Sequence, residues 1–217
     1  MPNLIIGGSS QLSHYFPVDY HRISSRNIDF DLIRRSGYDS IYIVFAEQRT
    51  FLSSSDKIFN EINVDYTIRV LDLVKDYCKR VVIYSTSELW NGYEGKIHID
   101  LPFLYGETPY IKSKELLCNY INMHREEYKN VVIIYPFNFN SPYRKEGFLF
   151  NKIFDSIINR RVNSVGDLDF ERDIIHPSII VHNSIIADSD KIIGSGELIN
   201  IKKFTSELFS IFNLSLS

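Results

Sequence analysis

Tyr110 and Lys114 stand four positions apart at the start of a segment with helical character, so their side chains share one helix face. A phenol with its ordinary pKa of about 10 is a poor base at neutral pH, but an adjacent ammonium group stabilises the phenolate and lowers that pKa. Upstream, Ser85-Thr86-Ser87-Glu88 directly follows a predicted strand, and Thr86 can hydrogen-bond the same substrate oxygen. These residues predict proton transfer at an alcohol or ketone.

The elements that must position these residues alternate between short apolar runs and amphipathic stretches. Strands are predicted at residues 4–6, 20–24, 39–45, 81–84, 131–134 and 191–193. Helices are predicted at residues 31–35, 54–78, 110–128, 148–159, 178–187 and 201–212. Such alternation predicts right-handed βαβ units and the α/β class, as a Rossmann-like, doubly wound parallel sheet.

The chain is expected to divide near its middle. Residues 1–135 are predicted to form the dinucleotide-binding Rossmann core. Residues 136–217 are predicted to be a mixed segment that completes the core and forms a small substrate-binding part. Between residues 92 and 109, glycines and prolines predict irregular structure.

The loop Gly7-Gly8-Ser9-Ser10-Gln11-Leu12-Ser13 follows the first strand, where a dinucleotide fold holds phosphate. Ser10 and Ser13 stand where the pattern G-x-x-G-x-x-G has glycines, so the loop is either a phosphate cradle or an ordinary strand-to-helix turn. The chain from Ser13 to Tyr20 is also short for a crossover helix, and Pro17 shortens it further.

Arg26 lies just after the second predicted strand, where an acidic residue would bind the adenosine ribose of NAD. A guanidinium group at this place either pairs with a 2'-phosphate or is a solvated surface residue. The first alternative favours NADP(H) over NAD(H).

Seven further segments appear in one consistent order. They are 7–13, Ala46-Glu47-Gln48-Arg49-Thr50 with Asn63-Val64, Ser85 to Leu89, Tyr110 to Lys114, Phe137-Asn138-Phe139-Asn140-Ser141-Pro142-Tyr143-Arg144, Arg172-Asp173-Ile174-Ile175-His176, and Gly194-Ser195-Gly196-Glu197. In this order they resemble the extended short-chain dehydrogenase/reductases, the NAD-dependent epimerase/dehydratase family that modifies nucleotide sugars. Thr86-Ser87-Glu88 is most similar to the GDP-mannose 4,6-dehydratases and UDP-glucuronate decarboxylases. Relatives continue for roughly another hundred residues, so the chain resembles a shortened member.

The resemblance implies a role for each matching residue. In the catalytic group, Tyr110 is the acid/base, Lys114 binds the nicotinamide ribose and Thr86 binds the sugar hydroxyl. Ser87 belongs to the same group. Glu88 is the base that removes the C5 proton in a dehydratase. Glu88 alternatively hydrogen-bonds the loop or a sugar hydroxyl. The cofactor-binding residues are Gly7, Ser9, Ser10, Gln11, Leu12, Arg26, Ala46, Tyr84, Tyr110, Lys114 and Phe137. The substrate-binding residues are Asn138, Arg144 and Arg172, the two arginines on the nucleotide diphosphate.

The resemblance therefore implies an NADP(H)-dependent enzyme acting by redox chemistry at C4 of a nucleotide-linked hexose. Its reaction would be that of a 4,6-dehydratase, an epimerase or a 4-keto reductase, supplying sugars for surface polysaccharides. One alternative is an inactive nucleotide-binding or regulatory protein, which the altered glycine loop favours. Another is a reductase of a small non-nucleotide carbonyl, which leaves Arg144 and Arg172 without a ligand.

Composition excludes several other classes. A net charge of -3 and the absence of a dense Lys/Arg run argue against a nucleic-acid or anionic-membrane partner. Cys78 and Cys118 both fall in predicted helices, without a Cys/His cluster, so no metal site is expected. With no export signal and no long apolar run, a cytoplasmic protein is expected. The resemblance adds a homodimer formed through the helices at 54–78 and 110–128.

Overall fold

A six-stranded parallel sheet forms the centre of the computed structural model, which describes residues 1–52, 55–144 and 146–215. Its strands are β1 (Leu4–Ile6), β2 (His21–Ile23), β3 (Tyr38–Ile43), β4 (Cys78–Tyr84), β5 (Val131–Pro136) and β9 (Lys191–Ile193). They lie in the order β2-β1-β3-β4-β5-β9, and each neighbouring pair is parallel. The predicted doubly wound α/β fold is therefore confirmed, with strand order reversing between β1 and β3.

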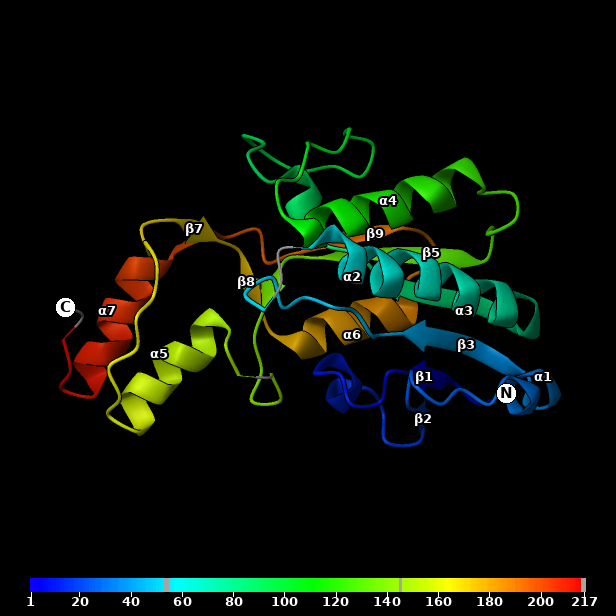
Figure 1. The fold of residues 1–217 in the computed structure, drawn as a ribbon, viewed down its shortest axis with the longest axis horizontal. Helices are drawn as coiled ribbons and strands as arrows, with labels where there is room; N and C mark the ends of the chain where they lie inside the picture. The colour runs from blue at the N-terminus through cyan, green and yellow to red at the C-terminus, as the bar shows by residue number, and fades with distance from the viewer. Residues whose placement is uncertain (53–54, 145, 216–217) are drawn as a thin grey trace.

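Helices cover both faces of this sheet (Figure 1). One face packs against α1 (Phe30–Ser36), α3 (Thr67–Val74) and α4 (Pro109–Met123), and the other against η1 (Leu12–Tyr15) and α6 (Pro177–Ile186). Leu4 and Ile6 belong to the first core and Ile5 to the second, because successive strand residues point to opposite faces. The continuous apolarity of the strands reflects burial on both sides.

The helix predicted at 54–78 is broken into several pieces. Residue 54 lies outside the described residues, and α2 (Asp56–Asn60) is followed by the π-helical η2 (Glu61–Tyr66), by α3 and by the 3-10 helix η3 (Lys75–Tyr77). Buried Asn63 lies in the π-helix, where its side chain accepts a hydrogen bond from Glu47 N (2.8 Å) and donates to Glu47 O and Ser113 Oγ (both 2.9 Å). A π-turn carries an extra residue, which here aims Asn63 at two other elements.

Two of the predicted helix ends are wrong. Cys78 opens β4, where it pairs with Tyr38, so pairing with β3 overrides the helical spacing that precedes it. The helix predicted to reach Tyr128 ends at Met123. The chain then turns so that Tyr128 is buried and its hydroxyl donates to Asp72 Oδ1 at 2.8 Å.

The crossover between β1 and β2 contains only the four-residue 3-10 helix η1. Arg22, on β2, donates hydrogen bonds to carbonyl oxygens along this crossover. The acceptors are Ser13, Phe16, Pro17, Val18 and Tyr20, at 2.9 to 3.4 Å. The expected shortness of this segment is thus confirmed, and one guanidinium group binds carbonyls that helical hydrogen bonds would otherwise satisfy.

The chain after β5 both leaves the sheet and returns to it. The small pairs β6 (Asn138–Phe139) with β8 (Ile174–Ile175) and β7 (Glu171–Arg172) with β10 (Ile199–Asn200) lie outside the main sheet, and α5 (Leu149–Ile158) and α7 (Ile201–Ile211) share a separate apolar cluster. In Figure 1 these two helices extend away from the sheet, whereas α6 lies against it. Among the described residues, no helix combines the length and apolarity needed to cross a bilayer.

Candidate active site

A cavity of about 400 Å³ lies beyond the carboxyl ends of β1, β3, β4 and β5. This is where an open parallel sheet with a strand-order reversal binds ligands, and the volume suits a small-molecule site. The cavity lining also includes residues of β7, β8 and the start of α5. Its lining includes Leu12, Phe45, Ala46, Gln48, Thr50, Tyr84, Ser85, Thr86, Glu88, Tyr110, Lys114, Phe137, Asn138, Phe139, Arg144, Phe148, Phe170 and Arg172.

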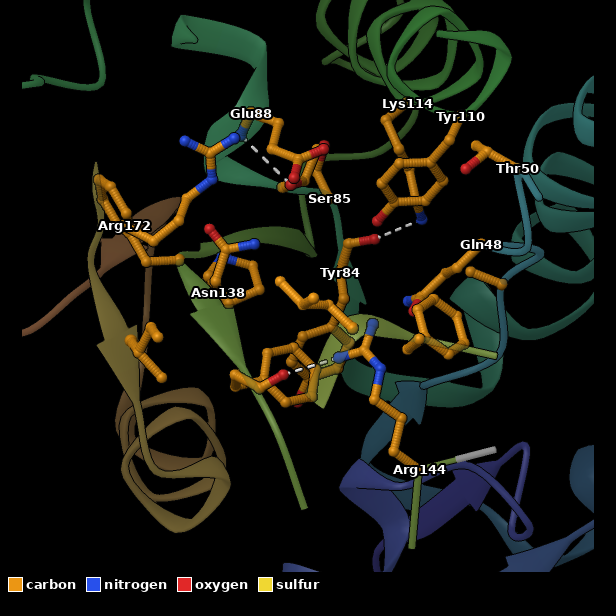
Figure 2. A pocket seen from close by; sticks show the side chains of 18 of the residues that line it. Gln48, Thr50, Tyr84, Ser85, Glu88, Tyr110, Lys114, Asn138, Arg144 and Arg172 are labelled. Atoms are coloured by element: carbon orange, nitrogen blue, oxygen red, sulfur yellow. Dashed lines mark hydrogen bonds between the residues drawn. The ribbon is translucent and has the colours of Figure 1, made fainter. Parts of the chain in front are cut away.

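Tyr110 and Lys114 occupy the first turns of α4 and both face this cavity (Figure 2). The helix starts here because Thr108 caps it, accepting a hydrogen bond from Ile111 N at 3.2 Å, and because Pro109 suits the first helical position. Lys114 is 4% exposed, its Nζ donates to Tyr84 O at 2.7 Å, and it lies 5.9 Å from the centre of the Tyr110 ring. The predicted pair is brought together at one end of the cavity.

Burial dominates the electrostatics of this pair. Burial lowers the pKa of Lys114 to about 8, because its ammonium form is poorly solvated. Burial also raises the pKa of Tyr110, and the nearby Glu88 raises it further, while Arg144 and a hydrogen bond to Thr86 lower it. The expected lowering of the Tyr110 pKa by Lys114 is not found: Lys114 is not among the groups that shift this pKa, and desolvation raises it.

Thr86 and Glu88 line the cavity from the end of β4. Thr86 caps the short helix η4 (Ser87–Trp90), and its Oγ1 accepts a hydrogen bond from Glu88 N at 3.2 Å. Ser87 is buried but is not among the residues that line the cavity. The predicted catalytic residues thus meet around one space, with Ser87 behind its wall.

The predicted cofactor residues divide into two sets. Leu12, Ala46, Tyr84 and Phe137 line the cavity with Tyr110 and Lys114. The lining does not include Gly7, Ser9, Ser10, Gln11 and Arg26. Arg26 is exposed beyond β2, at the edge of the sheet.

Gly7 shows why the loop after β1 runs so close to β3. Its φ is +105°, and an added Cβ would lie 3.0 Å from Phe45 N. Only glycine fits this turn without strain. The loop thus brings Leu12 into the same cavity as Ala46 and Lys114.

Asn138, Arg144 and Arg172, the predicted substrate residues, also line the cavity. Arg172 lies 4.7 Å above the Phe170 ring and donates to Glu171 O at 2.8 Å. Arg144 lies 4.0 Å above the Phe148 ring and donates to Phe139 O at 2.7 Å. In the view of Figure 2, Arg172 and Asn138 lie on one side of the cavity, and Arg144 and Gln48 on the other.

Sequence reasoning missed several parts of this site. Gln48 and Thr50 line the cavity, and Asn63 fixes their loop through the backbone of Glu47. The same Asn63 side chain reaches Ser113, whose hydroxyl donates to Tyr110 O at 2.7 Å. Gln48, Thr50 and Asn63 all stand in a segment that carries the family resemblance, which was the available signal, but they were given no role in the site. No group of three or more His, Cys, Asp and Glu residues suited to a metal occurs in the described parts of the chain.

Comparison with known proteins gives a family and a set of structural neighbours. Residues 14–187 match the model of the NAD dependent epimerase/dehydratase family. No curated protein sequence matches the chain.

Solved structures with the same fold share little sequence with the chain. The UDP-N-acetylglucosamine 4-epimerase from Methanobrevibacter ruminantium M1, in complex with UDP-N-acetylmuramic acid, has 16% identity and a TM-score of 0.81, over 98% of this chain and 82% of that one. A double mutant of the dTDP-glucose 4,6-dehydratase from Streptomyces venezuelae, with NAD bound, has 19% identity and a TM-score of 0.82, over 99% and 82%. RMD from Pseudomonas aeruginosa, complexed with NADPH, has 16% identity and a TM-score of 0.81, over 100% and 86%.

Proposed function

Since the chain belongs to the NAD dependent epimerase/dehydratase family, we propose that it oxidises or reduces C4 of a nucleotide-linked hexose with a nicotinamide dinucleotide. The observation that carries this proposal is the meeting of Tyr110, Lys114, Thr86 and Glu88 around one cavity at the strand ends. Neighbours solved with UDP-sugars and with NAD or NADPH support the substrate and cofactor classes.

When bound, the dinucleotide supplies hydride exchange at C4. Oxidation of C4 also removes a proton from its hydroxyl oxygen, and reduction returns one. Tyr110 is the group proposed to hold this proton, with Thr86 hydrogen-bonding the same oxygen. Burial raises the pKa of Tyr110, which favours the protonated phenol that reduction of a 4-keto group requires, whereas the oxidation that begins 4,6-dehydration requires the phenolate.

Lys114 is proposed to bind the nicotinamide ribose. Its Nζ lies at the wall of the cavity, fixed by the Tyr84 carbonyl. A lysine with a pKa of about 8 can donate hydrogen bonds to ribose hydroxyls in either protonation state. Leu12, Ala46 and Phe137 would enclose the same half of the cofactor.

Glu88 is the residue that distinguishes 4,6-dehydration from epimerisation and from simple reduction. A 4-keto group acidifies the proton at C5, and a carboxylate within the cavity can remove it before water leaves from C6. Glu88 lines the cavity beside Thr86. Its position supports 4,6-dehydration over epimerisation or simple reduction.

The experiment that tests this function is a screen of UDP-, GDP-, CDP- and dTDP-hexoses and their 4-keto derivatives with NAD(H) and NADP(H), read by mass spectrometry. We expect the product of one sugar nucleotide to have lost one water. A gain of two hydrogens would mean a reductase. An unchanged mass with a new stereoisomer would mean an epimerase. No product from any member would contradict the enzymatic proposal.

Glu88→Gln is expected to slow dehydration and the incorporation of solvent deuterium at C5 by about 10²- to 10⁴-fold, because the amide cannot accept the proton. Dinucleotide affinity should stay within about twofold, since the side-chain volume is preserved. Glu107→Gln is the matched control, an exposed glutamate outside the cavity lining. Unchanged C5 exchange in Glu88→Gln would remove Glu88 from the mechanism.

We further propose that NADP(H) is preferred over NAD(H). Arg26 is the support, because it is exposed after β2 with its guanidinium group available to a 2'-phosphate. NADP(H) should raise the Tm more than NAD(H) at equal concentration, and Arg26→Gln should remove the difference. Arg35→Gln, an exposed position on α1, is the control and should leave the difference between NADP(H) and NAD(H) unchanged. A larger shift with NAD(H) would reverse the preference.

The short crossover favours a second candidate, a protein that binds the nucleotide without turning over substrate. A four-residue 3-10 helix offers phosphate fewer oriented N–H groups than a full α-helix. A Tm shift with dinucleotide, combined with no product in the screen, would identify this candidate.

We also propose that the protein forms a homodimer and that it makes sugars for surface polysaccharides. The outer face of α4 supports the dimer, because Leu116 is 50% and Met123 75% exposed there. Residues of η2, α3 and α4 also line a hollow, namely Asp65, Ile68, Arg69, Asp72, Leu73 and Tyr120.

A further inference from the structure

Arg144 is a cation inside the cavity whose direct contacts are to uncharged groups. Burial lowers its pKa, although the Glu88 carboxylate lies near enough to act in the opposite direction and raise it. Nη1 donates to the Phe139 carbonyl and the guanidinium plane lies over the Phe148 ring. Its Nε is buried and has no hydrogen-bond partner within the described ranges. A guanidinium group held in this way has donors left for an anion, which it binds best in a planar, bidentate manner.

The neighbours of Arg144 in the chain are fastened to the loop after β1. Ser141 Oγ donates to Gln11 Oε1 at 3.1 Å. The Tyr143 ring stacks on the His14 ring, with centroids 3.9 Å apart and planes at 7°. Residues 141–144 thus form a wall opposite the loop in which a dinucleotide fold holds its phosphates.

Four backbone N–H groups of that loop are engaged within the protein and are not offered to a phosphate. Gly7 N and Gly8 N both donate to Ile23 O, Ser10 N donates to Gly7 O, and Ser13 N donates to Ser10 O. The helix that follows has four residues, so its N-terminus adds little positive potential. An anion bound here needs a cation from another part of the chain.

We propose that Arg144 binds the pyrophosphate of the nicotinamide dinucleotide, whereas the sequence resemblance had implied the diphosphate of the substrate. Its side chain lines the cavity together with Leu12, Ala46 and Gln48, and its own segment is attached to Gln11 and His14. Arg172, which lies beside Phe170 and across the cavity in Figure 2, is then the arginine that would bind the substrate diphosphate. This assignment rests on the proposed function.

The test compares Arg144→Gln and Arg172→Gln by isothermal titration calorimetry with separate ligands. The ligands are NADP(H), NAD(H), ADP-ribose, UDP and GDP. A charged hydrogen bond contributes about 1.5–3 kcal/mol, so Arg144→Gln should weaken the binding of the dinucleotides and of ADP-ribose by about 10- to 100-fold. ADP-ribose carries the pyrophosphate without the nicotinamide, which separates phosphate binding from ring contacts.

Arg172→Gln should produce the opposite pattern, weakening UDP or GDP and leaving the dinucleotides within about twofold. Arg144→Lys keeps the charge but loses the planar pair of N–H donors, so its dinucleotide affinity should lie between those of the wild type and Arg144→Gln. Circular dichroism and the Tm of each variant check that it is folded.

Dinucleotide binding that survives Arg144→Gln would overturn this assignment alone, and so would a loss confined to UDP or GDP. A wild-type protein that bound no dinucleotide would overturn the proposed function as well. The two failures are therefore distinguishable in one set of titrations.

Discussion

Tyr110→Phe is expected to reduce turnover by about 10²- to 10⁴-fold, the contribution of a positioned proton donor and acceptor. The substitution removes only the hydroxyl group, which faces the cavity beside Thr86. Phenylalanine fills the same volume, so α4 and the cavity wall should keep their packing. The loss should appear in kcat, because a group that acts in the transition state contributes little to ground-state binding.

Steady-state kinetics on the substrate identified by the screen, with dinucleotide affinity measured in parallel, is the check. Tyr105→Phe is the matched control, since that tyrosine is 97% exposed and lies on the same connection to α4. Turnover by Tyr110→Phe at the wild-type rate would show that another group moves the proton at O4.

Lys114→Met should stabilise the protein at pH 7 while it impairs turnover. The native pKa of Lys114 is about 8, against 10.5 for a free lysine. Each unit of difference corresponds to about 1.4 kcal/mol, so burying the charged form costs about 3 kcal/mol at pH 7. Loss of the hydrogen bond to Tyr84 O offsets about 1 kcal/mol, which leaves a net gain of about 2 kcal/mol in the free energy of unfolding.

The sign of this gain should change with pH. Between the native pKa and the unfolded pKa, the unfolded state of the wild type binds more protons, so wild-type stability rises with pH from about 8 to about 10.5. The methionine variant lacks this rise, and its advantage should shrink and then reverse across that window. Urea unfolding at a series of pH values measures it.

Lys112→Met provides the control, because Lys112 is exposed on the same helix. It should alter stability by less than about 0.5 kcal/mol at every pH. A Lys114→Met advantage that stayed constant from pH 7 to pH 10 would mean that Lys114 is not charged at a cost in the native state.

The elements with clear periodicity or two-sided burial could be predicted from the sequence. The strand at 191–193 has the same bounds in the structure, the helix predicted at 148–159 is one residue longer than α5 at each end, and the helix predicted at 201–212 is one residue longer than α7 at its C-terminus. Their patterns are local consequences of burial. That Tyr110, Lys114, Thr86 and Glu88 line one cavity could be predicted, because each lies at a strand end or a helix start, where topology indicates a ligand site.

Other features depend on residues distant in the chain and carry no local pattern. Asn63, in the π-helix, hydrogen-bonds Glu47 and Ser113 from other elements, and Cys78 becomes a strand residue because Tyr38 lies beside it. The raised pKa of Tyr110 likewise comes from the packing around it. Spacing in the sequence shows which residues share a face of an element but not how far folding removes water from that face.

The hydrogen bonds from Arg22 to the first crossover also bear on how the chain folds. An α-helix is nucleated by its own residues, whereas this crossover takes its bonds from a residue that follows it on β2. Each of these bonds joins residues no more than nine positions apart, so the crossover and the residues of β2 can become ordered together as one local unit. The shape of the loop that leads to Leu12 thus depends on one side chain of the edge strand.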